Sequence, residues 1–286
     1  MGIRSVGVCV KPDQPQLSDL IRELEEWLVA RRIEIFPDPE TAKWTNAAGT
    51  KRRELVEKAD AVVVLGGDGT LLAVARAIGA RPIPILGVNL GTMGFLAEIS
   101  RDELLTTLEE VISGRFRTEE RMRLEVVVER AGRELGRYLA LNEAVIANTA
   151  LARLIELEVR ADGVEVTTYH ADGLIVATPT GSTAYSLSAG GPLVLPSLEA
   201  IVLTPICPHS LSQRPLVLPQ TCEVAIDASG RPGGAIKLTV DGQVGCELSE
   251  GDRVSVRRSE HSVRLLIPPG RSRFEVLRQK LRWGER

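Results

Sequence analysis

The hydrophobic positions of the first ~118 residues alternate between strand-like and helix-like spacing. Short apolar runs at 6–10, 33–36 and 61–65 predict strands, and Pro84 should make a fourth run at 83–88 short or irregular. Strands that alternate with helices indicate an α/β domain. The first helix is predicted from apolar residues at helical spacing, which are Leu17, Leu20, Ile21, Leu24, Trp27 and Leu28.

Two later segments also carry helix signals. A capping box, Ser100 with Glu103, precedes apolar positions at helical spacing, and Gly114 follows them as a stop signal. The last ~16 residues return to helical spacing at Phe274, Leu277 and Leu281. We expect this C-terminal helix to pack on the α/β domain and to keep its basic residues in solvent.

After Arg121 the apolar residues follow a period of two and turn residues become frequent. So many short strands indicate a layered β domain. The predicted architecture is a Rossmann-like α/β domain at 1–118 and about 268–286, and a β-sandwich domain at 119–267. The strand-like runs of the second domain are 124–128, 138–146, 154–160, 173–178, 201–204, 222–228, 235–240, 253–257 and 263–267.

Composition and charge exclude several classes of protein. A chain of 286 residues is long enough for two cores, and a net charge of −3 gives no indication of a nucleic-acid or membrane partner. The apolar runs are too short to span a bilayer, and the N-terminus is typical of a strand rather than a signal peptide. Four isolated cysteines favour small buried core residues and a reducing, cytoplasmic compartment.

The stretch Gly66-Gly67-Asp68-Gly69-Thr70 stands between an apolar strand and a predicted helix. A glycine turn at a helix N-terminus is typical of an anion-binding site. Asp68 would repel a phosphate unless it holds a metal ion or accepts a proton, so it indicates phosphoryl chemistry. The P-loop pattern is absent, and Leu72 replaces the third glycine of a dinucleotide fingerprint. An ordinary strand–turn–helix corner explains the spacing equally well.

A second candidate segment runs from His170 to Pro192 and contains many hydroxyl side chains. Buried hydroxyls need partners, so a polar ligand would explain their density, with Tyr185 offering a ring face to a base. The alternative is a Ser/Thr-rich loop that caps a helix near Ser182. A serine hydrolase is disfavoured because G-x-S-x-G is absent around these serines.

Asn142 and Glu143 interrupt the apolar run at 138–146, so at least one of them should face the core or a site. An amide beside a carboxylate suits a ribose diol because the pair offers a donor and several acceptors. The alternative is a strand end or a bulge. Asp241-Gly242-Gln243 is a weaker signal, since Asp-Gly is foremost a hairpin turn.

Taken together, Gly66–Thr70, Asn142-Glu143 and the stretch from Asp172 to Pro192 resemble the NAD kinase family. Leu203–Leu211 and Asp241-Gly242 fit the same family. The glycine–aspartate loop also occurs in lipid kinases and phosphofructokinases, so the stretch from Asp172 to Pro192 discriminates. The resemblance implies a kinase that converts NAD to NADP by phosphorylating the 2′-hydroxyl of the adenosine ribose.

The resemblance also implies roles for individual residues. Asp68 would be the catalytic base, acting on the ribose hydroxyl with Gly69 beside it. The donor phosphates of ATP or polyphosphate would lie on Gly66, Gly67, Gly69 and Thr70, with Mg²⁺ or another divalent metal held mainly by those phosphates rather than by a protein cage. NAD would contact Asn142, Glu143, Arg153, His170, Asp172, Thr183, Ala184, Tyr185, Ser186, Leu187, Ser188 and Gln243. The site would lie between the domains, and the family commonly forms dimers and tetramers.

His170 departs from the family pattern, because many relatives carry Arg or Gly at this position. A cation there could favour one nicotinamide redox state, so the preference for NAD or NADH stays open and could depend on pH. Two rival functions remain: a lipid kinase, which would need an apolar acceptor pocket, and a non-catalytic dinucleotide sensor, which would not need Asp68.

Overall fold

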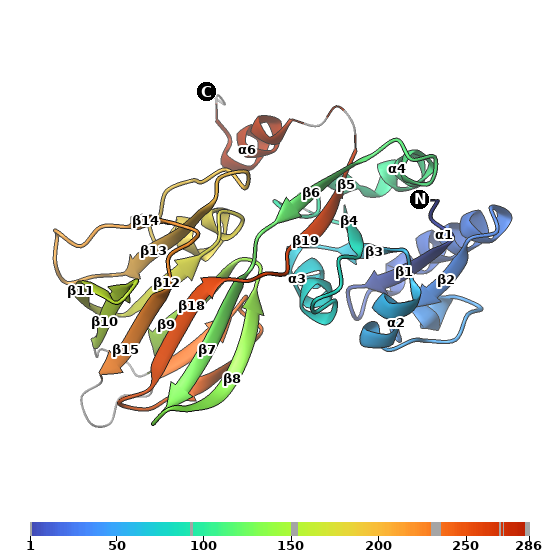
Figure 1. Ribbon diagram of the computed structural model, residues 1–286. Coiled ribbons are helices and arrows are strands. Elements are labelled where there is room, and N and C mark those ends of the chain that lie inside the picture. The colour runs from blue at the N-terminus through green and yellow to red at the C-terminus, as the bar shows by residue number, and fades with distance from the viewer. Residues whose placement is uncertain are drawn as a thin grey trace. The chain divides into compact units, whose positions relative to one another are not determined.

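The computed structural model describes residues 2–91, 94–149, 154–229, 236–268, 270 and 272–283 (Figure 1). The chain divides into two compact units. The first unit comprises Met1–Glu120 and Val263–Arg286, and the second comprises Arg121–Ser262. Each unit has a hydrophobic core of its own.

The first unit is built on a seven-stranded, largely parallel sheet. Its order is β2-β1-β3-β4-β19-β6, and the short β5 also pairs with β4. All six residues of β1 and of β3 are buried, as expected for parallel strands covered on both faces. The strands are β1 (Ser5–Val10), β2 (Glu34–Pro37), β3 (Ala61–Gly66), β4 (Pro84–Asn89), β5 (Ile99–Ser100), β6 (Arg117–Arg121) and β19 (Val263–Ile267).

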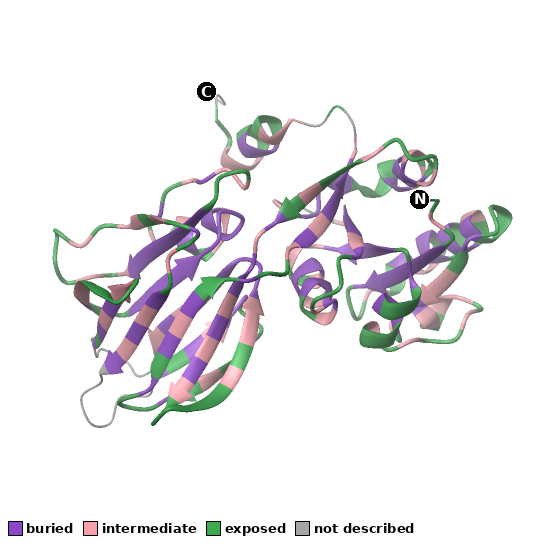
Figure 2. Ribbon diagram, in the orientation of Figure 1, coloured by how far each residue is buried: buried purple, intermediate pink, exposed green. Residues whose placement is uncertain are grey.

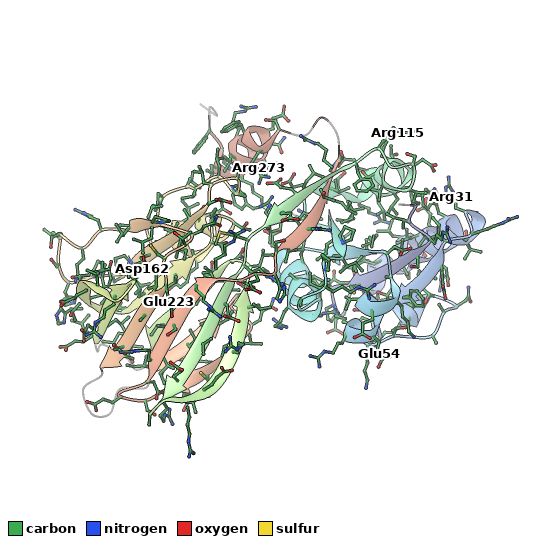
Figure 3. All side chains as sticks on the ribbon, in the orientation of Figure 1. Arg31, Glu54, Arg115, Asp162, Glu223 and Arg273 are labelled. Carbon is green, nitrogen blue, oxygen red and sulfur yellow. The ribbon has the colours of Figure 1, made fainter. Side chains whose placement is uncertain are left out.

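The described part of this unit contains five α-helices, and short 3₁₀ turns (Pro15–Leu17, Thr41–Trp44 and Arg101–Glu103) precede or connect them. The predicted capping box is confirmed, with the Ser100 backbone N–H donating to Glu103 Oε2 at 2.9 Å. At the start of the last helix, Arg273, labelled in Figure 3, forms an ion pair with Glu119 of β6. The helices are α1 (Ser18–Ala30), α2 (Arg52–Lys58), α3 (Asp68–Ala77), α4 (Leu104–Ile112) and α6 (Arg273–Leu281).

Two sequence predictions about this sheet were wrong. The strand with Pro84 is neither short nor irregular: β4 has six residues, and the five from Ile85 to Asn89 pair with β3 in unbroken register. Pro84 is the first residue of the strand, where a missing N–H is tolerated. The run at 263–267, assigned to the second domain, pairs in parallel with β4 as β19. Its nearly continuous burial is typical of a parallel strand, whereas its choice of sheet depends on contacts remote in sequence.

The second unit contains two six-stranded sheets, ordered β11-β10-β15-β18-β7-β8 and β14-β13-β12-β9-β16-β17. Buried and less buried residues alternate along β7, as Figure 2 shows, and the buried set forms one core. The first sheet contains β7 (Leu124–Arg130), β8 (Arg133–Ala140), β10 (Ile155–Ala161), β11 (Val164–Ala171), β15 (Val224–Ser229) and β18 (Arg253–Arg258). The second contains β9 (Glu143–Asn148), β12 (Gly173–Ala177), β13 (Ala200–Ile206), β14 (Leu216–Pro219), β16 (Ile236–Val240) and β17 (Val244–Leu248).

The predicted single strand at 138–146 is wrong. The apolar run forms the end of β8 in one sheet and the start of β9 in the other, and the chain crosses between them at Leu141 and Asn142. An apolar run predicts burial but does not specify that two sheets share it.

Two further findings bear on the sequence predictions. Only Cys9 is a buried core residue, whereas Cys207 is exposed and Cys222 and Cys246 are partly exposed, so the expectation of four core cysteines was wrong. In the part of the chain that the structure describes, no helix is long and apolar enough to cross a membrane.

Candidate functional site

Asp68 is the first residue of α3 and follows the glycine turn that ends β3. Its carboxylate accepts three consecutive backbone N–H groups: Phe95 at 2.9 Å, Leu96 at 3.1 Å and Ala97 at 3.1 Å. A carboxylate has roughly four acceptor positions, so about one is left for a ligand hydroxyl. Asp68 is partly exposed, so this position can be reached from solvent.

The glycines around Asp68 differ in what requires them. A Cβ on Gly66 would lie 2.5 Å from Thr70 Oγ1, and one on Gly94 would lie 2.0 Å from Asp68 Oδ1. By contrast, a Cβ on Gly67 or Gly69 would meet none of the described atoms within 4 Å, and neither residue has a positive φ. The fold therefore requires Gly66 and Gly94, whereas Gly67 and Gly69 leave open space at the start of α3.

Sequence reasoning missed the segment from Gly87 to Ala97. A Cβ on Gly87 would lie 2.8 Å from Leu71 Cδ1 of α3 and 3.0 Å from Ala97 Cα, so this glycine lets β4 approach both elements. Gly94, as described above, lets the following backbone reach Asp68. The available signal was three glycines, at 87, 91 and 94, beside a buried strand.

Asp241 holds the crossing between β8 and β9. It lies in the turn between β16 and β17 at φ 50°, is buried, and accepts the backbone N–H groups of Leu141, Asn142 and Glu143 at 2.9, 2.8 and 3.1 Å. The predicted hairpin turn at Asp241-Gly242 is therefore present. Sequence reasoning missed that the same carboxylate fixes Asn142-Glu143.

Asn142 and Glu143 are both buried at the start of β9, so the strand-end interpretation describes their local geometry. Burial and, to a lesser extent, the charge of Asp241 together raise the pKa of Glu143 to about 8, and a backbone N–H from Tyr185 opposes the shift. Glu143 is therefore mostly protonated at neutral pH. Its Oε2 atom is buried and has no hydrogen-bond partner among the described residues.

The hydroxyl-rich segment is largely satisfied from within the fold, and this corrects the argument that its density requires a ligand. Thr178 Oγ1 donates to Leu141 O at 2.6 Å, and Ser182 Oγ bonds to Pro179 O at 2.7 Å and to the Val194 backbone. Ser186 and Thr204 share a bond of 2.8 Å. A short helix, α5 (Tyr185–Ser188), follows a 3₁₀ turn at Gly181–Thr183.

The part of this segment that remains available to a ligand is the surface of α5. Tyr185 is 46% exposed and Ser188 is exposed, whereas Thr183, Ala184 and Leu187 are partly exposed and Ser186 is buried. Because the Tyr185 N–H interacts with Glu143, the structure brings α5 beside Asn142-Glu143.

Both halves of the chain match models of one protein family. Residues 6–116 match the ATP-NAD kinase N-terminal domain, and residues 141–267 match the ATP-NAD kinase C-terminal domain. The NAD kinase of Geobacter sulfurreducens is 48% identical over 285 residues, covering 99% of this chain and 100% of the relative. The NAD kinase of Syntrophotalea carbinolica is 46% identical over 286 residues, with the same coverage. The chain belongs to the NAD kinase family.

Solved structures of this family share the fold. A yeast NADH kinase complexed with NADH has a TM-score of 0.90 at 29% identity, covering 100% of this chain and 89% of that chain. An NAD kinase from Archaeoglobus fulgidus in complex with ATP has a TM-score of 0.77 at 28% identity, covering 97% and 98%. The predicted pairing of an α/β domain with an all-β domain is confirmed, and the chain is a phosphotransferase.

The remaining residues implied by the NAD kinase resemblance lie at other places in the second unit. His170 on β11 has Nδ1 3.6 Å from Glu156 Oε1, and Asp172 is exposed just before β12. Glu143 pairs with Ala177 at the opposite end of β12, four residues or about 13 Å along the strand. Gln243 is exposed beside Asp241, and Arg153 lies outside the described residues. The structure therefore groups Asn142, Glu143 and α5, and separates His170 and Asp172 from them.

Proposed function

We propose that this chain transfers a phosphoryl group from ATP to the 2′-hydroxyl of the adenosine ribose of NAD, giving NADP. The observation that carries the proposal is Asp68, a carboxylate with one acceptor position left, at the start of α3 beside the open space at Gly67 and Gly69. Its place in a chain that matches both NAD kinase domains supports the same function.

Asp68 would act as the general base. Its free acceptor position takes the proton of the ribose hydroxyl while that oxygen forms a bond to the γ-phosphorus, and the bond to the ADP oxygen breaks. Proton removal of this kind contributes about 10²–10⁴ in rate. The donor phosphates would lie against Gly66, Gly67, Gly69 and Thr70, where the positive end of the α3 dipole favours an anion.

The dinucleotide would bind through Asn142 and Glu143, with the exposed ring of Tyr185 available for a base. The other side chains of α5 that reach solvent would line the same region. His170, Asp172 and Gln243 would serve a separate part of the ligand, because β12 separates the first two from Glu143.

A divalent metal ion, Mg²⁺ in the first instance, would be held mainly by the donor phosphates and water. Among the described residues, no group of three His, Cys, Asp or Glu side chains could form a protein cage for it. Magnesium commonly binds in this way, and it would supply neutralisation of the phosphate charge. We also propose a cytoplasmic location. We further propose a dimer or tetramer, and sedimentation equilibrium of the purified protein would measure the mass of the assembly.

The proposal is tested by incubating the purified protein with NAD, ATP and Mg²⁺ and following NADP with an NADP-specific dehydrogenase. Asp68→Asn should abolish most activity, whereas Asp19→Asn, an exposed carboxylate in the first turn of α1, should leave it unchanged. A wild-type protein that forms no NADP with ATP, other nucleoside triphosphates or polyphosphate would refute the kinase function.

His170 is proposed to influence the choice between NAD and NADH. It is half-exposed, with Nδ1 3.6 Å from Glu156 Oε1, and a histidine ring offers a ligand a donor or an acceptor. His170→Ala should alter the pH dependence of the NAD:NADH ratio of kcat/KM between about pH 6 and 8. If the NAD:NADH ratio of kcat/KM were the same in wild type and variant and did not change with pH, His170 would have no such role.

A further inference from the structure

We infer that Lys11 binds the phosphates of the phosphoryl donor, supplying the cation that this glycine turn lacks. The inference rests on the proposed kinase function, because it concerns the donor side of the same site. In a P-loop, a lysine follows the glycines and reaches the phosphates. Here no lysine follows Gly69 closely, so a lysine beside this turn comes from another element.

Sheet pairing places Lys11 beside the glycine turn. Lys11 directly follows β1, and β1 runs parallel to β3 with Val10 opposite Leu65. The Lys11 backbone N–H donates to Leu65 O at 2.9 Å, which extends this pairing to the end of β3. Lys11 and Gly66 therefore stand next to each other at the carboxyl ends of two adjacent strands, where open α/β sheets bind their ligands.

The Lys11 side chain leaves the sheet on the face that carries the start of α3. A Cβ on Gly66 would lie 3.4 Å from Lys11 Cβ and 2.5 Å from Thr70 Oγ1, so both side chains lie on the same side of Gly66. Thr70 belongs to the first turn of α3. From this point a flexible four-carbon stem can carry an ammonium group to an anion at the helix N-terminus.

The charge of Lys11 is available to a ligand. Lys11 is exposed, and no carboxylate of a described residue forms an ion pair with it. Arg52 lies at the same end of β1, with Nη2 3.4 Å from Val10 O, but its guanidinium donates two bonds to Asp38, at 3.0 and 2.8 Å. Asp38 thus compensates the charge of Arg52, whereas no described carboxylate compensates that of Lys11.

The charge of Lys11 would offset the repulsion between Asp68 and the phosphates of the donor. Asp68 places a negative charge at the start of α3, which opposes the approach of a polyanionic donor such as ATP. The helix dipole offsets about half a charge, and one ammonium group beside Gly66 supplies another full charge. A lysine acts here as a point charge with three donors, so it suits the phosphates of ATP and of polyphosphate alike.

The test compares Lys11→Ala and Lys11→Arg with Lys58→Ala, an exposed lysine at the C-terminal end of α2 whose backbone carbonyl accepts from Ser5 at the other end of β1. Lys11→Ala should raise KM for ATP about 10- to 100-fold, the range of a lost charge-assisted bond, and leave KM for NAD within about twofold. Lys11→Arg should recover most of the loss, and Lys58→Ala should match wild type. Circular dichroism of each variant establishes that it is folded.

Direct binding of the fluorescent analogue TNP-ATP separates this inference from the proposed function. Weaker TNP-ATP binding by Lys11→Ala supports the role of Lys11 even if the wild type forms no NADP. An active wild type whose KM for ATP is unchanged by Lys11→Ala, or changed equally for ATP and NAD, would overturn the inference and leave the kinase function standing.

Discussion

Asp68 in the first unit and Asp241 in the second unit use the same device. Each carboxylate accepts three consecutive backbone N–H groups from a remote segment, 95–97 for Asp68 and 141–143 for Asp241. They differ in burial: Asp68 is partly exposed at a helix start, whereas Asp241 is buried in a hairpin turn. In the first unit these bonds hold a carboxylate that a ligand can reach. In the second unit they hold a segment of backbone in place.

Burial also determines what each negative charge affects. The charge of Asp241 adds to the effect of burial on Glu143 and keeps that second carboxyl protonated near neutral pH. The charge of Asp68 lies where a ligand can approach, at the positive end of α3. Asp241 therefore sets the state of a neighbouring side chain, and Asp68 is proposed to act on the substrate.

The largest expected effect is on catalysis and comes from Asp68→Asn. The amide keeps the shape of the side chain but cannot accept the ribose proton, so kcat should fall about 10²- to 10⁴-fold. Its nitrogen would also face at least one backbone N–H that now donates to Asp68, so the variant should be less stable as well. Steady-state kinetics with NAD and ATP measures the loss, and calorimetry should find NAD binding nearly unchanged. A variant that keeps more than about a tenth of wild-type kcat would contradict the role of Asp68 as base.

Asp241→Asn should instead destabilise the second unit. One amide nitrogen would face backbone N–H groups that now donate to a charged oxygen, at a cost of about 2–4 kcal/mol in the free energy of unfolding. Urea denaturation of wild type and variant measures this loss in the free energy of unfolding.

The matched control is Asp162→Asn in the Asp-Gly turn between β10 and β11, where Asp162 has a φ of 51°. Figure 3 labels Asp162 and Glu223, and Asp162 Oδ1 accepts the Glu223 backbone N–H at 2.8 Å near the surface. This substitution should cost about 1 kcal/mol or less. If both substitutions lowered the free energy of unfolding equally, the three buried bonds of Asp241 would stabilise the fold no more than the single surface bond of Asp162.

Glu143→Gln should change the pH dependence of stability. Because the folded pKa of about 8 exceeds the ordinary value of 4.5, the folded chain holds a proton that the unfolded chain has lost between about pH 5 and 8. The free energy of unfolding should therefore fall with rising pH across this window, by up to roughly 1.4 kcal/mol per unit from this group. Glutamine removes this slope, so the variant should gain about 3–4 kcal/mol relative to wild type between pH 5 and 8. If the free energy of unfolding changed equally in wild type and Glu143→Gln between pH 5 and pH 8, the result would argue against a protonated Glu143.

The smallest expected effect on stability comes from Gly67→Ala. The position has open space and a φ of −113°, so the variant should lose about 1 kcal/mol or less, while KM for ATP rises several-fold because the methyl group obstructs the phosphates. Gly94→Ala provides the contrast, since its Cβ would lie 2.0 Å from Asp68 Oδ1 and should disturb both stability and kcat. An unchanged KM for ATP in Gly67→Ala would place the donor elsewhere.

The sequence predicted the local features well. The helices beginning near Ser18 and Asp68, the capping box at Ser100 and the turn at Asp241-Gly242 each depend on residues within a few positions. The predictions that were wrong concern partners remote in sequence. Neither periodicity nor spacing could place 263–267 beside β4, or divide 138–146 between two sheets.

The sequence by itself determined two regions of different periodicity and a glycine turn with a carboxylate at a helix start, because these features arise from backbone geometry and burial over short distances. Only the tertiary structure decided what the carboxylates hold. The bonds of Asp68 span 27 to 29 residues and those of Asp241 span 98 to 100. Hydrogen bonds of this range exist only after the sheets have brought the segments together, so no local pattern encodes them.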